Sequence, residues 1–127
     1  MERTPCKEIK LENDHCLEIF DDSRKIADDA CVVIMTAEMK IPVQKELFTI
    51  EPVTDKMFET ILETLGSPIV YTYRVERNMI MDNEREALFE SLVTTFMENT
   101  GKYIAKPSFP EKLVLKEYRE RIEKKTP

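Results

Sequence analysis

The chain of 127 residues is long enough for one domain with one core, and its 42% hydrophobic and 35% charged residues are typical of a globular protein with a heavily charged surface. The two glycines, Gly66 and Gly101, are too few for a glycine-rich phosphate loop, and the absence of both a run of about 18 apolar residues and an apolar N-terminal signal argues against a membrane-spanning or secreted protein. Residues 1–100 hold 11 Lys and Arg against 21 Asp and Glu, so the acidic body should repel nucleic acid and anionic membranes, whereas residues 101–127 hold 8 against 4.

Two short strands are predicted near the N-terminus, within residues 8–20. Ile9 and Leu11 alternate with charged residues, and Leu17 and Ile19 share one face of the second segment. The pair Asn13-Asp14 between them is typical of a turn. Residues 21–30, which follow, contain the polar pair Asp28-Asp29 and suit a hairpin connection to the next strand, so we expect antiparallel pairing.

The clearest strand is predicted over residues 31–43. One of its faces is apolar throughout, and the other changes from apolar at Val32 and Ile34 to polar at Thr36, Glu38 and Lys40. Such a strand is buried on both faces at one end and half-solvated at the other. Because proline has no N–H for a sheet hydrogen bond, pairing should end at Pro42.

Residues 44–54 lack a regular pattern, although Leu47, Phe48, Ile50 and Val53 can anchor them to the core. A helical apolar pattern follows over residues 55–65, with Thr54 or Asp55 as its N-cap and Gly66 as its end. Residues 69–81 alternate again and are rich in β-branched and aromatic side chains, which predicts a strand.

Two further helices are predicted. The first covers about 84–100, with a capping box at Asn83–Glu86 and Gly101 as its stop signal. Its wide apolar stripe leaves room for self-association, and it comprises Ala87, Leu88, Phe89, Leu92, Val93, Phe96 and Met97. The second begins at a capping box, Ser108–Glu111, and mixes Lys and Arg with Glu at a spacing that supports a solvated helix.

Strands and helices do not alternate strictly, which favours an α+β domain over a doubly wound parallel sheet. We expect one domain over residues 1–127, with an antiparallel sheet of about four strands and three helices packed on one face. Residues 1–7 and 123–127 are expected to be frayed ends.

The stretch Asn13-Asp14-His15-Cys16 holds the single histidine and raises the question of a metal or thiol site. Adjacent side chains on a strand point to opposite faces, and the three cysteines, Cys6, Cys16 and Cys31, have irregular spacing without a CxxC pair. We therefore predict neither a metal site nor a Cys-His nucleophile, no cofactor, and reduced thiols in a cytoplasmic protein.

Other candidate sites are weaker. The acidic pairs Asp21/Asp22 and Asp28/Asp29 could bind a cation, although the calcium-loop pattern is absent and solvated turns are the simpler interpretation. Residues 71–77 place tyrosines next to arginines, as in sheets that stack RNA bases, but Tyr71 and Tyr73 share a face with core residues.

We expect a non-catalytic interaction or ligand-binding module that self-associates, most simply as a homodimer, with a protein or small-molecule partner. Its site would be the polar face of the sheet or a cleft between sheet and helices, with the face carrying Thr36, Glu38, Arg74 and Glu76. One alternative is a small enzyme with acid-base groups among His15, Asp21, Asp22, Glu38 and Glu76. Nucleic-acid binding through the basic last helix is a weaker alternative, and no catalytic residue is assigned.

Overall fold

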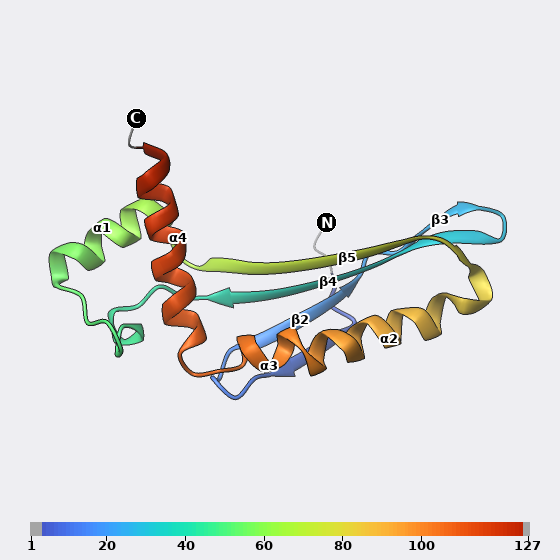
Figure 1. Ribbon diagram of the computed structural model, residues 1–127, viewed down its shortest axis with the longest axis horizontal. Helices are drawn as coiled ribbons and strands as arrows, with labels where there is room; N and C mark the ends of the chain where they lie inside the picture. Colours follow the sequence, from blue (N-terminus) through green and yellow to red (C-terminus); the bar gives the residue numbers. More distant parts are fainter. Residues whose placement is uncertain (1–3, 126–127) are drawn as a thin grey trace.

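In the computed structural model, which describes residues 4–125, an antiparallel sheet carries four α-helices (Figure 1). The strands are β1 (Lys7–Lys10), β2 (Cys16–Asp21), β3 (Arg24–Ala27), β4 (Ala30–Ile41) and β5 (Ile69–Met81). The helices are α1 (Asp55–Leu65), α2 (Arg85–Glu98), α3 (Thr100–Ile104) and α4 (Phe109–Lys125), with short 3-10 turns η1 (Lys45–Leu47) and η2 (Asp82–Glu84). This arrangement confirms the predicted α+β class.

The long strand β4 organises the sheet. Along one of its edges, β4 pairs with β3 near its start and with β2 further on. Its other edge pairs with β5 along its whole length. The N–H of Asp22 still donates to the carbonyl of Ile34 at 3.0 Å after β2 ends, so β2 and β3 form one interrupted line along β4. The sheet therefore has five strands where four were expected, because β3 lies inside the stretch predicted as a connection.

Four helices pack on the sheet where three were predicted: α2 and α3 run along it, and α4 crosses the beginning of β5 with α1 beyond it (Figure 1). The apolar face of β4, formed by every second residue from Cys31 to Ile41, lies in one core cluster with buried residues of all four helices. These are Ile61 of α1, Phe89, Val93 and Phe96 of α2, Ile104 of α3, and Phe109, Val114, Leu115 and Tyr118 of α4. Val32 and Ile34 are also buried, and Lys40 is exposed, which confirms that β4 changes from two buried faces to one.

Helix α1 and strand β5 have the predicted bounds. The Thr54 hydroxyl accepts a hydrogen bond from the N–H of Met57 at 3.1 Å, which satisfies one of the free donors at the start of α1. Gly66 ends the helix with φ of 74°, a conformation that glycine adopts without steric cost, and its N–H donates to the carbonyl of Leu62. Strand β4 ends at Ile41, directly before Pro42, as expected.

The next helix lies within two residues of its predicted bounds, but its predicted start and stop signals were wrong. Helix α2 begins at Arg85, after η2, and its N-cap Glu84 makes no side-chain cap bond, so the predicted capping box does not form. The helix ends at Glu98, and Gly101 lies buried inside α3. A Cβ atom at Gly101 would come within 3.3 Å of the Met97 side chain and of the Phe96 carbonyl oxygen, so this glycine permits close packing of α3 on α2.

The core contacts of residues 44–54 and the two chain ends also differ from expectation. Ile50 is 60% exposed and does not anchor its loop, whereas Phe48 is buried. Lys7 begins β1 and α4 runs to Lys125, so regular structure reaches into both stretches expected to fray, and residues 1–3 and 126–127 lie outside the described residues. In the part of the chain that is described, no helix has both the length and the apolar character needed to cross a membrane.

Candidate interaction surface

The four residues predicted to bind a partner lie in the centre of the sheet and at one edge. Thr36 of β4 pairs with Arg74 of β5, and Glu38 lies two residues further along β4. Thr36 is only 4% exposed, and its hydroxyl donates to an Asp22 carboxylate oxygen at 2.8 Å. The expectation that Thr36 is open to water was therefore wrong: its hydroxyl is used inside the fold.

Arg74 and Glu76 differ from Thr36 because they stand on β5, at the edge of the sheet. Their side chains are 52% and 37% exposed and form an ion pair with 3.6 Å between Nη1 and Oε2. Exposed ion pairs contribute little to stability, typically below about 1 kcal/mol. These two side chains are thus available to a partner without loss of the fold, whereas Glu38 is half-buried.

The burial of Thr36 gives a stability prediction. Thr36→Val keeps the side-chain shape but removes the hydroxyl that donates to Asp22, so we expect a loss of about 1 kcal/mol in the free energy of unfolding. The matched control is Thr72→Val, the same change at an exposed threonine on the neighbouring strand, which should stay within about 0.5 kcal/mol of the unchanged protein. Urea unfolding measures both, and equal effects would contradict a structural role for the Thr36 hydroxyl.

The free edge of β5 is the most extended unpaired part of the backbone. On β4, the N–H of Ile34 donates to the Ser23 hydroxyl and its carbonyl accepts from Asp22, so both groups point away from β5. Along an antiparallel strand, the backbone N–H and C=O groups of successive residues point to opposite edges, so those of Met35 point toward β5. Met35 and its partner Val75 therefore exchange hydrogen bonds. It follows that the backbone groups of Val70, Thr72, Arg74 and Glu76 point outward, and within residues 4–125 only β4 pairs with β5.

The other edges of the sheet are better protected. Strands β1 and β3 have four residues each and carry Lys7, Lys10, Arg24 and Lys25. Short edge strands with lysine side chains resist the addition of another strand. Strand β5 has 13 residues, and its exposed side chains include large apolar ones, namely Val70, Tyr73, Met79 and Met81. Only β5 offers a long edge with apolar character among the described strands.

A cleft lies beside the first residues of this edge, between β5 and α4. Its volume is about 530 Å³, and it is lined by Leu65, Pro68, Ile69, Val70, Tyr71, Thr72, Leu113, Lys116, Glu117 and Arg121. A smaller pocket of about 200 Å³ next to it shares Tyr71, Leu113 and Lys116. The cleft therefore combines apolar side chains, outward backbone groups of β5 and basic side chains of α4 in one place.

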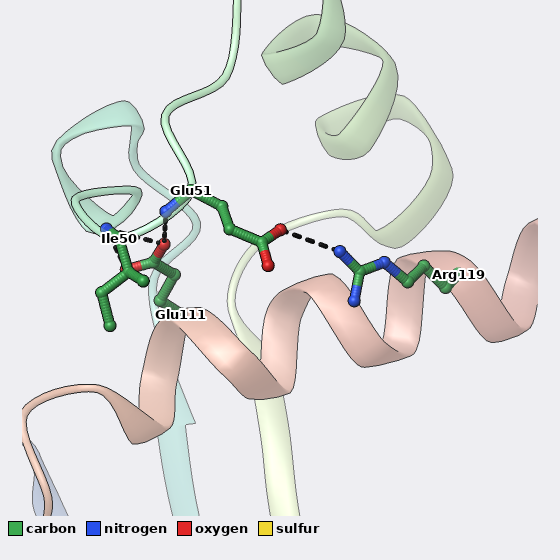
Figure 2. Close-up of polar contacts among 4 residues, drawn as sticks. All are labelled: Ile50, Glu51, Glu111 and Arg119. Atoms are coloured by element: carbon green, nitrogen blue, oxygen red, sulfur yellow. Dashed lines mark hydrogen bonds and ion pairs between the residues drawn. The ribbon is translucent and has the colours of Figure 1, made fainter.

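The position of α4, which forms one wall of the cleft, is set by the Glu111 carboxylate (Figure 2). This carboxylate accepts hydrogen bonds from three successive backbone N–H groups, those of Thr49, Ile50 and Glu51, at 2.6 to 3.1 Å. Two turns further along α4, Arg119 donates to the Glu51 carboxylate at 2.8 Å. The loop after η1 is thus attached to α4 at two points, although about 60 residues separate them in the chain.

Glu111 is charged in spite of its burial. It is 2% exposed, and burial by itself raises the pKa of a carboxyl group. The hydrogen bonds from Glu51, Ile50 and Thr49 outweigh this effect, because they stabilise the ionised form, and the pKa of Glu111 lies below its ordinary value. The three N–H groups form an anion-binding concavity that the protein fills with its own carboxylate.

Aromatic contacts hold β5 against the helices below it. The Tyr71 ring meets the Phe109 ring edge to face, with centroids 5.5 Å apart, and Tyr73 lies 4.8 Å from Phe96. Both tyrosines thus face the helices, which favours their assignment to core packing over base stacking. Burial, with a smaller effect from Tyr73, raises the pKa of Tyr71.

The stretch around His15 does not bring metal-binding groups together. His15 lies in the turn between β1 and β2, where its N–H donates to the Asn13 side chain at 3.2 Å, and Cys16 begins β2 with an exposed side chain. Cys31 is buried in β4, and no three His, Cys, Asp or Glu side chains among residues 4–125 are placed to share a metal ion.

The remaining thiol, Cys6, lies in a second cleft of about 500 Å³ between β1 and α2, with Asp21 and Arg85. Burial and the Asp21 carboxylate raise the pKa of Cys6, so the thiol stays protonated at neutral pH. A protonated thiol is a poor nucleophile, because the thiolate is the reactive form. This cleft thus lacks an activated cysteine.

The acid-base set considered from the sequence is dispersed in the structure. His15 precedes β2, and Asp21 and Asp22 follow at its other end, so the length of β2 separates them by about 20 Å. Asp21 accepts from the Ser23 N–H, Asp22 accepts from Thr36, and Glu76 pairs with Arg74. Asp28 and Asp29 form the exposed turn between β3 and β4. These groups serve separate local contacts.

The sequence predicted a site on the polar face of the sheet or in a cleft between sheet and helices, but it did not indicate that β5 lies at an edge, that the cleft lies between α4 and β5, or that Glu111 positions α4. Residues 69–81 alternate as any half-buried strand does, and this alternation does not show on which side the strand has no neighbour.

Comparison of the chain with models of known protein families, with curated proteins and with solved structures finds no match.

Proposed function

We propose that this protein is a non-catalytic interaction module that binds an extended polypeptide segment along the outer edge of β5. The observation that carries the proposal is the row of outward backbone groups at Val70, Thr72, Arg74 and Glu76, which matches the spacing of a further antiparallel strand. Added strands gain affinity from such main-chain hydrogen bonds, and neighbouring pockets give them specificity.

The α4–β5 cleft supports the same proposal by offering a pocket next to the edge. Leu65, Ile69 and Leu113 provide apolar surface for one side chain of the bound segment, and Lys116, Glu117 and Arg121 give the cleft charged groups of both signs. Small and specific binding sites usually combine apolar walls with a few polar groups in this manner. The preferred ligand is therefore an extended segment with an apolar side chain placed at the cleft.

The basic last helix is better explained by contacts with the rest of the chain than by nucleic-acid binding. Arg119 pairs with Glu51, and Arg121 donates to the Thr64 carbonyl at 3.1 Å. The Nζ atom of Lys116 lies 4.0 Å from Oε1 of Glu120 on the same helix.

We propose that the protein lies in the cytoplasm, a compartment that keeps thiols such as the exposed Cys6 and Cys16 reduced.

Selection of peptides from a random library tests the proposal. The protein is immobilised at low density, so that two copies cannot meet, and the enriched peptides are expected to alternate apolar residues as a strand does. Their binding should protect the amides of Thr72, Arg74 and Glu76 from hydrogen exchange. Thr72→Pro should abolish this binding, because it removes an outward N–H at an edge position where proline is compatible with the strand.

The control for Thr72→Pro is Thr72→Val, which keeps the backbone N–H and should bind the peptides with unchanged affinity. Circular dichroism and thermal unfolding of both variants verify that the fold persists. If the enriched peptides bind the Thr72→Pro variant as well as the unchanged protein, or if they protect other amides, the β5 edge is not the binding element.

A further inference from the structure

We propose that the segment bound by the β5 edge is β5 of a second copy of this chain, in an antiparallel pair about a two-fold axis at Val75. This inference rests on the proposed function, since it names the occupant of the same edge. Two copies paired in this way would form one continuous sheet. Three features of the chain support this pairing: the hydrogen-bonding direction of β5, the charges along β5, and the charges at the two ends of the sheet.

Hydrogen-bonding direction limits the possible registers. Outward backbone groups belong to even-numbered residues from Val70 to Glu76, so an even-numbered residue of one copy must oppose an even-numbered residue of the other. The two-fold axis must then lie where one residue of β5 faces the same residue of the other copy. Near the middle of the strand this leaves axes at Tyr73, Arg74, Val75 and Glu76.

Charge selects among these four registers. An axis at Arg74 places two arginines opposite each other, and an axis at Glu76 does the same with two glutamates, which is unfavourable. An axis at Tyr73 leaves Arg74 opposite Thr72 and Glu76 opposite Val70. An axis at Val75 places Arg74 of each copy opposite Glu76 of the other, so that two new cross-strand ion pairs add to the existing pair within each strand.

The helix-facing side of β5 fits the same register. Tyr73 of one copy comes opposite Arg77 of the other, which suits a cation–π contact, and the two Val75 side chains meet on the axis. A small pocket of about 100 Å³ between β5 and α2 already has Tyr73, Val75 and Arg77 among its lining residues. The second copy would therefore cover this pocket, with its Arg77, Val75 and Tyr73 opposite Tyr73, Val75 and Arg77 of the first.

The two ends of the sheet are complementary in charge. In Figure 1 the helix α4 crosses the beginning of β5, and the turn between β3 and β4 lies beyond its other end. The far end carries exposed acidic residues in excess, namely Asp28, Asp29, Asp82, Glu84 and Glu86, of which Asp82 pairs with Lys25. Helix α4 has six Lys and Arg against four Glu, so it keeps a net positive charge although Arg119 pairs with Glu51. An antiparallel pair brings the acidic end of each copy next to the basic helix of the other.

The same pairing fills the α4–β5 cleft. Regular pairing of β5 ends near Asn78, because Met79 has a positive φ of 56° and lies in a β-bulge. In the Val75 register the residues that follow come beside Ile69–Thr72 of the other copy, where the cleft opens. Met79 and Met81 are 71% and 46% exposed in the single chain, and the cleft offers them apolar surface.

Disulfide cross-linking tests the register. In a background with Cys6→Ser and Cys16→Ser, Val75→Cys should give a dimer linked by one disulfide on mild oxidation, because residues facing each other on the axis have Cα atoms about 4.5 Å apart. Tyr73→Cys is the matched control. In the Val75 register its two Cα atoms are offset by four residues, about 13 Å along the strands, which is too far for a disulfide.

Charge reversal tests the interface without new cysteines. Arg74→Glu and Glu76→Arg should each weaken the dimer about tenfold or more, since each places like charges opposite each other twice. The double variant Arg74→Glu/Glu76→Arg restores opposite charges and should return the dissociation constant to within about threefold of the original. Sedimentation velocity over a range of concentrations measures all three.

The outcomes separate this inference from the proposed function. A chain that stays monomeric at high concentration, but binds selected peptides in a manner sensitive to Thr72→Pro, overturns the two-fold dimer and leaves the edge as the binding element. A dimer that cross-links through Tyr73→Cys, or is unaffected by charge reversal, overturns the Val75 register. Efficient Val75→Cys cross-linking with rescue by the double charge variant is the expected result.

Discussion

Glu111→Ala is expected to lower the free energy of unfolding by about 3 kcal/mol at neutral pH, because three backbone N–H groups lose a charged acceptor at once. The groups affected are those of Thr49, Ile50 and Glu51, and the loop that contains them would also lose its alignment with Arg119. Urea unfolding measures the loss. Glu51→Ala removes the exposed ion pair but keeps the Glu111 contacts, and this control should cost less than about 1 kcal/mol.

The pH dependence of stability gives an independent test of the same carboxylate. The pKa of Glu111 is lower in the folded protein than its ordinary value of 4.5, so the folded state binds this proton less readily than the unfolded chain does. Its contribution is therefore complete above pH 4.5 and is lost as the pH falls through the lower folded pKa. The difference in stability between the unchanged protein and Glu111→Gln should be constant at neutral pH and shrink below pH 4.5.

Two outcomes would contradict this account of Glu111. A difference between Glu111→Gln and the unchanged protein that does not shrink at all as the pH falls below 4.5 would mean that the ionised carboxylate is not the stabilising species. Equal losses for Glu111→Ala and Glu51→Ala would mean that the backbone contacts contribute no more than the exposed ion pair.

Ile61→Ala is expected to destabilise the protein by about 3 kcal/mol, because the substitution removes apolar surface and leaves a cavity. Within α1, all of which the structure describes, Ile61 is the one buried residue, and it joins the core cluster beneath the sheet. Met57→Ala is the control on the same helix, since Met57 is 40% exposed and should change stability by less than about 0.5 kcal/mol.

Hydrogen exchange distinguishes a local from a global effect of Ile61→Ala. The other apolar residues of α1 that contact the core, Phe58, Leu62 and Leu65, are only half-buried, and Phe58 meets Phe48 edge to face. We therefore expect the amides of α1 to exchange faster than those of β4 in the variant, as in the opening of a single unit. Equal acceleration in α1 and β4 would show that α1 does not open as a separate unit.

The predicted elements were most accurate where local chemistry determines the structure. The bounds of α1 follow from a capping threonine and a terminal glycine, and those of β5 from a long alternating run. The missed strand β3 has four exposed residues, so no apolar alternation distinguishes it from a loop. The break between α2 and α3 at Asn99 was missed because Gly101 was predicted to end the helix. Glycine often ends helices, but Gly101 instead allows α3 to pack closely on α2.

The candidate site was less predictable because its elements meet only in three dimensions. Thr36 and Arg74 look equally polar in sequence, yet the first is buried beside Asp22 and the second stands at an edge. Glu111 was predicted to cap its own helix and instead binds a loop about 60 residues earlier. The order of strands in the sheet decides which strand is exposed at an edge, and that order is a tertiary property.

The unequal edges of the sheet determine how far an assembly can grow. A subunit with two receptive edges adds neighbours on both sides and forms an open fibre. In this protein β1 is short and carries two lysines, whereas β5 is long and carries apolar side chains. In the proposed dimer the two β5 edges cover each other, so only the short, charged edge strands β1 and β3 stay open, and these disfavour the addition of a further sheet.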